Sequence, residues 1–330
     1  MGLHEVKSSR PSKVRGRRRT GRGALYSSES RLYHQIVVPL VGFLPGPIAY
    51  GVAILRGDIT YRLSASRRDM LACLQQLFGE KFDARQRAQI VRDHYRIRSC
   101  EPIDAIRLLG RGRSLTRLVE VRGLDYLKQA SAKGKGAVLC SAHFGSLRVV
   151  FSLVGALGFP VTIIARWTQE DSPEGGQGKR TWGWPYAKAL HLKGSNILQT
   201  PGGFDAAVKG IDVLRSNGFL GIMIDSQVEP GDMSRPFPFQ FLGHEAELAM
   251  GAGVIAQAAD APLIVAILRR SADWRHQVLD IFPPVYAQRD PIAAQERCLA
   301  LIESAVAKYP AHWNKMNPTD LWQMKLLPKG

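Results

Sequence analysis

The sequence predicts an α/β fold in which a mostly parallel central sheet is flanked by helices and preceded by an N-terminal amphipathic helical anchor. From Val119 onward, short apolar runs bounded by Gly and Pro alternate with segments of helical periodicity. Four runs have the length of buried strands: "GAVLCSA", "VTIIAR", "GFLGIMID" and "PLIVAILRR". The helical patterns are "SLRVVFSLVGALG", "GFDAAVKGIDVLRSNG" and "LAMGAGVIAQAAD". Such alternation is typical of a parallel sheet covered by helices.

Three regions are expected along the 330 residues. Residues 1–30 form a disordered basic tail, residues 31–115 a membrane-interfacial and amphipathic helical region, and residues 116–330 the α/β domain. Between residues 66 and 110, apolar side chains recur at helical spacing among many charges, which predicts two or three amphipathic helices.

The chain is strongly basic, with a formal net charge of +17. Its first 24 residues carry only Glu5 against these cations: Lys7, Arg10, Lys13, Arg15, Arg17, Arg18, Arg19 and Arg22. A basic excess on both tail and body favours an anionic partner, either an acidic membrane surface or nucleic acid. Charge alone does not distinguish the two.

The run Ile36–Leu55, "IVVPLVGFLPGPIAYGVAIL", contains no charged residue and is long enough to cross a bilayer. Its central Pro-Gly-Pro break disfavours one straight helix. Two short segments in the membrane interface, with the basic tail near anionic headgroups, are the favoured interpretation. A true span and an ordinary core hairpin stay open as alternatives.

Several site classes lack their signatures. The four cysteines show no CxxC spacing, so neither a disulfide framework nor a zinc site is expected. No P-loop, dinucleotide fingerprint, GxSxG elbow or HExxH motif is present, so no nucleotide cofactor and no metal are expected.

The stretch "VLCSAHFGSLRVV", Val138–Val150, places His143 where a buried strand passes into a helix. Ligands bind at the C-terminal edge of strands in open α/β sheets, and a histidine there can act as a general base. Gly145 leaves room for close approach. A histidine that caps the helix or satisfies a core hydrogen bond is the alternative.

At this point the chain resembles a family. "GKGAVLCSAHFGSLRV" is similar to the catalytic-histidine block of the late lipid A acyltransferases and the phosphatidylinositol mannoside acyltransferases, within the lysophospholipid acyltransferase superfamily. Further stretches follow in the family's order: "VEVRGLDYL", "VLRSNGFLGIMIDSQVEPG", "RPFPFQFLGHEAELAMGAGVIAQAADAPLIVAILRR" and "KYPAHW". The resemblance covers roughly Val119 to Trp313.

The resemblance implies a glycerol-3-phosphate acyltransferase-like fold and transfer of a fatty acyl group from an acyl carrier protein or coenzyme A thioester. The acceptor would be a hydroxyl of a membrane lipid or glycolipid, with His143 as general base and no cofactor beyond the thioester co-substrate. It also implies a bacterial protein on the cytoplasmic face of the inner membrane.

One position departs from the family pattern His-x-x-x-x-Asp/Glu, because Arg148 stands where the carboxylate usually does. A cation beside an imidazole disfavours the imidazolium that base catalysis forms. The stretch "FLGHEAEL" resembles the phosphatidylinositol mannoside acyltransferases, which carry a glutamate that pairs with the histidine, and this resemblance implies that Glu245 replaces the carboxylate as the partner of His143. Arg148 is then expected to bind substrate phosphate or donor phosphopantetheine.

Three further residues are candidates for substrate binding. Asp225 ends a predicted strand and occupies the place of a family acid that organises the active-site loop, with a helix or turn cap as its alternative role. Arg166, at another strand end, is expected to hold a phosphate unless it forms a surface salt bridge. Glu247 lies beside Glu245, and a solvated turn is the alternative for both. The segment Asp171–Gly194, with Trp182 and Trp184 among basic residues, is expected at the lipid headgroups, with a nucleic-acid contact or a packed loop as alternatives.

The sequence therefore favours a membrane-associated acyltransferase whose partners are an acyl thioester, a lipid acceptor and an anionic membrane surface. Nucleic acid is the less favoured partner. Two alternatives remain: a catalytically inactive paralogue that binds anionic lipid or nucleic acid, and an acyltransferase that acts on an amine or a secondary-metabolite acceptor.

Overall fold

A computed structural model describes residues 38–42, 44–109, 118–147, 149–166, 196–200, 203–228 and 236–326. The basic tail at 1–30 and the tryptophan-containing segment 171–194, both singled out in the sequence, lie outside the described residues.

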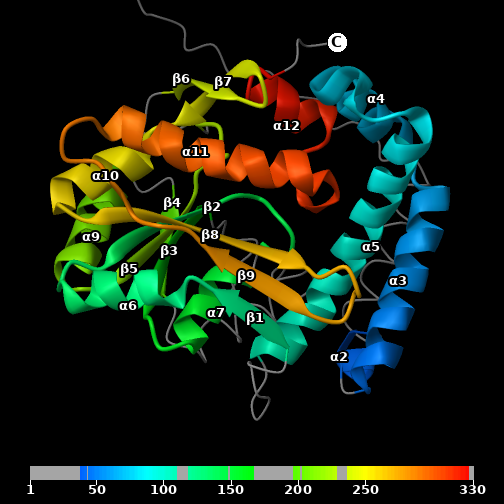
Figure 1. The fold of residues 1–330 in the computed structure, drawn as a ribbon, viewed down its shortest axis with the longest axis horizontal. Coiled ribbons are helices and arrows are strands. Elements are labelled where there is room, and N and C mark those ends of the chain that lie inside the picture. The colour runs from blue at the N-terminus through cyan, green and yellow to red at the C-terminus, as the bar shows by residue number, and fades with distance from the viewer. Residues whose placement is uncertain are drawn as a thin grey trace, which may run out of the picture.

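Eight of the described strands form a central sheet in the order β1-β9-β8-β2-β5-β3-β4, and the eighth, β10, pairs with β8 (Figure 1). Strands β8, β2, β5, β3 and β4 run parallel, whereas β9 is antiparallel to β8 and parallel to β1. The strands are β1 (Val119–Arg122), β2 (Ala137–Ser141), β3 (Val161–Arg166), β4 (Asn196–Thr200), β5 (Phe219–Met223), β8 (Pro262–Arg270), β9 (Gln277–Ile281) and β10 (Val285–Tyr286). The four predicted strands are β2, β3, β5 and β8, and the predicted α/β fold class is confirmed.

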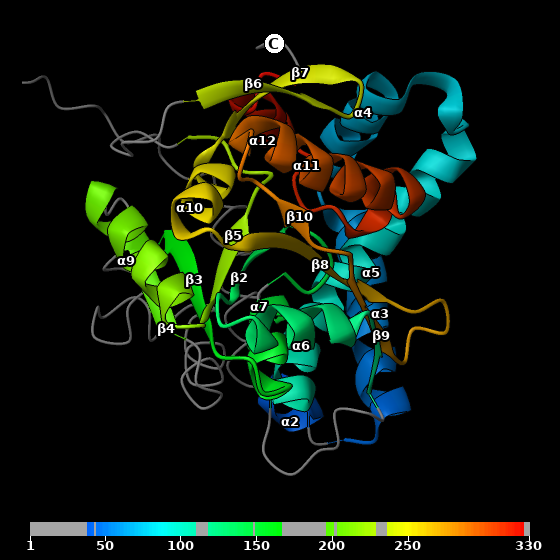
Figure 2. The ribbon, with the colours of Figure 1, turned by 60° about the vertical axis from the view of Figure 1, so that its left-hand side comes forward.

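Helices cover both faces of the sheet (Figures 1 and 2). One face carries α9 (Gly203–Arg215), α10 (Gly251–Ala259) and α11 (Pro291–Lys308), and the other carries α6 (Leu124–Ala132) and α7 (Val150–Ala156). Side chains of β2 alternate between the two cores: Val138 and Cys140 face the α10–α11 side, whereas Ala137 and Leu139 face the α6–α7 side. Burial of both faces explains why the parallel strands read as continuous apolar runs.

A separate hairpin of β6 (Pro236–Phe241) and β7 (His244–Ala249) packs beside α12 (Pro318–Gln323). The helix predicted from Leu248 instead begins at Gly251. The backbone before it is extended because Glu247 N–H donates to Met324 O at 2.9 Å and Ala249 N–H donates to Ser226 O at 3.0 Å. Tertiary hydrogen bonds therefore override the local helical pattern.

The N-terminal helices stand along one edge of the molecule (Figure 1). They are α2 (Val38–Gly42), α3 (Gly46–Leu63), α4 (Arg67–Phe78), the short helix η2 (Gly79–Lys81) and α5 (Ala84–Leu109). The Pro-Gly-Pro break separates α2 from α3 as predicted, because Pro45 precedes the helix and Pro47 lies in its first turn. The helical patterns predicted between residues 66 and 110 correspond to α4 and α5.

Helix α3 is longer than the short segment expected, because it packs along α5. Its inner face carries the small residues Ala49, Ala53 and Gly57, which allow close approach. A Cβ atom at Gly57 would lie 2.5 Å from Arg96 Cα. Asp58 fixes the same contact, since it accepts hydrogen bonds from Arg92 and Arg96 on α5.

The close approach of α3 and α5 predicts opposite effects for two glycines of one helix. Gly57→Ala should lower the free energy of unfolding by about 1 to 3 kcal/mol, because the added methyl meets α5 backbone. Gly51 has open space around the Cβ position, so Gly51→Ala should raise it by up to about 1 kcal/mol through helix propensity. Urea unfolding of both variants measures the difference; equal effects of the two would contradict this packing.

Candidate active site

His143 lies in a loop that follows β2, and its backbone is fixed by the C-terminal part of the chain. Asn314 N–H donates to His143 O at 2.7 Å, and Gly145 N–H donates to His312 O at 2.7 Å. Between these bonds, Phe144 pairs with Trp313 in an isolated β-bridge. The segment that contains "KYPAHW" therefore acts as a short antiparallel clamp on the histidine loop.

Gly145 is required for this loop geometry. Its φ of 57° lies in the left-handed region, and a Cβ atom would stand 2.2 Å from Leu268 O on β8. Only glycine meets both conditions without displacing backbone. The room that the sequence indicated beside His143 is thus occupied by a neighbouring strand rather than by a ligand.

Asp225, two residues after β5, is the partner of His143. Its Oδ1 lies 2.8 Å from His143 Nδ1, and both carboxylate oxygens accept the His143 backbone N–H, at 2.9 and 3.1 Å. The Trp313 indole N–H donates to Asp225 Oδ2 at 3.0 Å. The Asp225 carboxylate is fully buried, so these donors replace its water.

The pKa of Asp225 is lower than that of an ordinary aspartate. Burial alone would raise the pKa. The adjacent His143, the positive charge of Lys315 and the hydrogen bond from Trp313 together lower the pKa by more than burial raises it. Lys315 is itself buried and donates to Gln227 Oε1 at 2.9 Å. Asp225 therefore stays ionised at neutral pH inside the protein.

This geometry selects one form of the His143 ring. A carboxylate only accepts, so Nδ1 carries the proton and donates it to Asp225, which leaves Nε2 unprotonated in the neutral ring. The His143 side chain is 28% exposed, in contrast to its buried partner. A half-buried imidazole with an unprotonated Nε2 and an ionised carboxylate behind it has the arrangement of a general base.

The expected pairing of His143 with Glu245 is not what the structure shows. Glu245 lies in β7, where Ala246 and Leu248 face the core and Glu245 projects from the opposite face into solvent. Glu247 shares that outer face and forms an ion pair with Lys325. Strand alternation therefore directs both glutamates away from the core, and the solvated alternative describes Glu245.

The other two candidates are only partly placed. Arg166 is the last residue of β3 and so lies at a strand end, as predicted; only its backbone is described. Arg148 lies outside the described residues. The Asp225 contact nevertheless answers the question that Arg148 raised, because a carboxylate does stand behind the histidine.

Sequence reasoning missed Trp313 and Lys315 as parts of the site. Trp313 is the last residue of the quoted "KYPAHW" block, and Lys315 lies two residues after it. The position of this block near the end of the chain gave no reason to place it beside His143. The available signal was Trp313 itself, since the indole N–H of a buried tryptophan needs a hydrogen-bond acceptor.

Two further histidines are buried and stay neutral. Burial, assisted by the charges of Arg270 and Arg269, lowers the pKa of His312 to about 3, and its Nε2 accepts the Arg270 backbone N–H at 3.1 Å. Burial and the charge of Arg98 lower the pKa of His94 to about 3. Both histidines are structural. The His312 ring stacks on the Phe144 ring, with 5.3 Å between the ring centroids, and so supports the loop that carries His143.

A cavity of about 240 Å³ lies between α11 and strands β1, β8 and β9. Its basic and polar lining includes Arg122, Arg269, Lys308 and Tyr309, and His143 does not contribute to it. Within the part of the chain that the structure describes, no group of three or more His, Cys, Asp and Glu side chains could hold a metal ion.

A family model described as bacterial lipid A biosynthesis acyltransferase matches residues 32–174 of the chain. The match includes α3, α5, β2 and the loop with His143, whereas Asp225 and Trp313 lie beyond it. No curated protein matches the chain.

The low pKa of Asp225 predicts a pH-dependent contribution to stability. Because this pKa is lower in the folded protein than in the unfolded chain, the charged group stabilises the fold above the ordinary aspartate pKa of about 4. The contribution is lost as the pH falls through the folded-state pKa. Asp225→Asn should therefore reduce the free energy of unfolding by about 3 kcal/mol at neutral pH, and by less in acid.

Urea unfolding of the native protein and Asp225→Asn from about pH 7 to about pH 3 measures this difference. The difference between the two curves should narrow as the pH falls below about 4, because the unfolded chain then takes up a proton that the folded Asp225 carboxylate resists. A difference that is constant over the whole range would show that Asp225 is not stabilised as a carboxylate.

Proposed function

We propose, from the match of residues 32–174 to the lipid A biosynthesis acyltransferase family model, that the protein transfers a fatty acyl group from a thioester to a hydroxyl of a lipid or glycolipid. The donor is an acyl carrier protein or coenzyme A thioester. His143 is the general base, and Asp225 is its partner in place of Glu245.

The single observation that carries this proposal is the contact between His143 Nδ1 and the buried Asp225 carboxylate. In the reaction, His143 Nε2 takes the proton of the acceptor hydroxyl while the hydroxyl oxygen attacks the thioester carbonyl carbon. The new C–O bond forms, the C–S bond breaks, and the thiolate takes the proton from the imidazolium. Asp225 stabilises the imidazolium and keeps the ring oriented.

Helix α3 supplies the surface that we assign to the membrane. Its inner face packs on α5, whereas its outer face and the preceding turn expose large apolar side chains at helical spacing. These are Leu44, Ile48, Leu55, Ile59 and Leu63, with exposed fractions of 38 to 76%. We call this row the outer stripe of α3. Contiguous exposed apolar surface on a monomer marks an interaction site.

Charge favours an anionic bilayer as the partner of the outer stripe. The exposed Arg62 and Arg68 flank its C-terminal end, and the segment before α2 carries the excess of Lys and Arg noted above. Apolar side chains inserted at the headgroup boundary with cations beside them are the pattern of an interfacial helix. Among the described helices, none combines the length and the apolar character needed to span a bilayer.

The proposed roles predict the activity of three variants. His143→Ala should lower acceptor-dependent release of thiol from an acyl thioester by about 10² to 10⁴-fold. Asp225→Asn should lower it by at least about 10²-fold, because an amide can donate to Nδ1 and so favours the tautomer with its proton on Nε2. Glu245→Gln, a matched change of an exposed carboxylate, should stay within about twofold of the native rate.

The measurement uses native membrane lipid extract as acceptor, with acyl-carrier-protein and coenzyme A donors tested separately. Loss of activity in Glu245→Gln but not in Asp225→Asn would restore the sequence-based pairing. Equal background release by the native protein and all three variants would indicate a protein that binds lipid without catalysis.

The outer stripe predicts which surface change abolishes vesicle binding. Leu55→Glu with Ile59→Glu should reduce sedimentation with vesicles of anionic phospholipid at least about tenfold, since two carboxylates replace inserted apolar groups. Val254→Glu, at an exposed valine of α10, is the control and should bind as the native protein does. Equal loss in both, or in neither, would contradict the assignment of this surface.

A further inference from the structure

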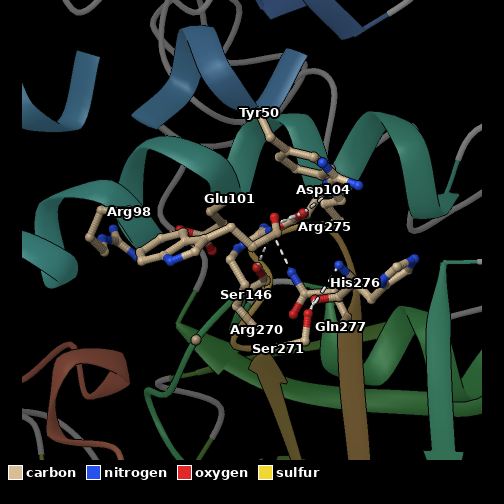
Figure 3. A network of polar contacts seen from close by, with 12 residues as sticks. Tyr50, Arg98, Glu101, Asp104, Ser146, Arg270, Ser271, Arg275, His276 and Gln277 are labelled. Atoms are coloured by element: carbon tan, nitrogen blue, oxygen red, sulfur yellow. Dashed lines mark hydrogen bonds and ion pairs between the residues drawn. The ribbon is translucent and has the colours of Figure 1, made fainter. Parts of the chain in front are cut away.

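A second buried carboxylate, Asp104 of α5, gathers four side chains from different elements (Figure 3). It accepts hydrogen bonds from the Tyr50 hydroxyl at 2.9 Å and from Gln277 Nε2 at 2.8 Å, and it also accepts one from the Ser146 hydroxyl. Arg270, at the end of β8, completes the group with an ion pair to Asp104. Asp104 and Arg270 are almost fully buried, so each depends on the other for its charge partner.

Ser146 connects this group to the catalytic loop. It stands three residues after His143 and is 2% exposed, and its carbonyl accepts the Val149 N–H at 2.8 Å. Asp225 and the clamp at residues 312–314 hold the loop at His143. The Asp104–Ser146 bond holds it at the other end, so the loop is fixed between two buried carboxylates.

Tyr50 connects the same group to α3. It lies on the inner face of the helix, opposite the outer stripe, and it is 4% exposed. Burial and the charge of Asp104 raise the pKa of Tyr50, so its hydroxyl remains a donor. The Arg270 guanidinium stacks on the Tyr50 ring with 4.6 Å between its carbon and the ring centroid. A displacement of α3 therefore acts directly on Asp104.

Stability alone gives no reason for this arrangement, because a buried ion pair is often no more stabilising than apolar side chains of the same volume. What the arrangement does provide is a fixed distance between α3 and the loop. Each bond to Asp104 has one geometry, whereas apolar packing would tolerate several.

We propose that Asp104 is a positioning residue: it holds Ser146 in the loop that carries His143 and, through Tyr50, ties that loop to α3. This inference rests on the proposed function. Binding of the outer stripe to a membrane would then favour the loop conformation in which the imidazole faces the acceptor hydroxyl, so that transfer is faster on vesicles than in detergent.

Asp104→Asn is a poor test, because it leaves the Arg270 guanidinium buried without its charge partner and is expected to unfold the protein. Ser146→Ala removes only the link to the loop. Ser152→Ala on α7 is the matched control, because Ser152 is equally buried and its hydroxyl has no hydrogen-bond partner among the described residues.

For Ser146→Ala we expect kcat to fall about tenfold with KM for the acyl donor unchanged, since misplacement of a catalytic group affects the reaction and not donor binding. Ser152→Ala should keep the native kcat. A fall in kcat that Ser152→Ala reproduces, or a Ser146→Ala enzyme with native kcat, would overturn the inference.

The link to α3 is measured as the ratio of the rate on anionic phospholipid vesicles to the rate in detergent. Tyr50→Phe should lower this ratio at least about threefold relative to the native protein. Tyr61→Phe is the control on the same helix, because the Tyr61 ring packs on Tyr95 and Arg67 and not on Asp104; it should keep the native ratio.

An unchanged ratio in Tyr50→Phe, or equal loss in both variants, would overturn the coupling through Tyr50. The native enzyme distinguishes this failure from that of the proposed function. If the native protein transfers no acyl group, the proposed function fails and the inference fails with it. If it is active and the variants behave as their controls, only the inference fails.

Discussion

A carboxylate without water must find its hydrogen-bond donors inside the protein, and Asp225 takes them from two distant parts of the chain. His143 approaches from the end of β2 and donates from both its backbone and its ring, and Trp313 donates from the C-terminal segment. These contacts fix where β2 and β5 end relative to each other and bring the C-terminal clamp onto the histidine loop. The clamp, the left-handed Gly145 and the stacked His312 all follow from that placement.

The loop from His143 to Ser146 is short, and each of its ends meets a buried charge. His143 meets Asp225, and Ser146 meets Asp104. The first contact determines which nitrogen of the imidazole is free; in our proposal the second determines where that nitrogen stands. The same loop therefore connects the sheet, the C-terminal segment and the helices proposed to face the membrane.

The fold was predictable from the sequence because its parallel strands are buried on both faces, and runs such as Ala137–Ser141 need no tertiary information to be recognised. The position of His143 at a strand end was predictable for the same reason. The break before α3 was predictable because prolines restrict the backbone. The start of α10 was not, since the extended backbone at Glu247 and Ala249 depends on hydrogen bonds to Met324 and Ser226.

The pairing of His143 with Asp225 could not be predicted from the sequence, although Asp225 was a candidate for the site. Asp225 and His143 are 82 positions apart and meet because β2 and β5 pair in parallel, with Ser141 opposite Met223. Strand order is a long-range property, and no local pattern specifies it. Glu245 was expected as the partner because of the resemblance of "FLGHEAEL" to relatives with a pairing glutamate, and only the β6–β7 hairpin reveals that its side chain lies on the outer face.

Asp225 fixes the His143 ring with its proton on Nδ1. ¹⁵N NMR of the histidine side chains measures this most directly, with His143 assigned by the loss of its signal in His143→Ala, at a pH alkaline enough to keep the imidazole neutral. We predict a protonated Nδ1 and an unprotonated Nε2 in the native protein, reversed in Asp225→Asn. A native His143 with its proton on Nε2 would contradict the account.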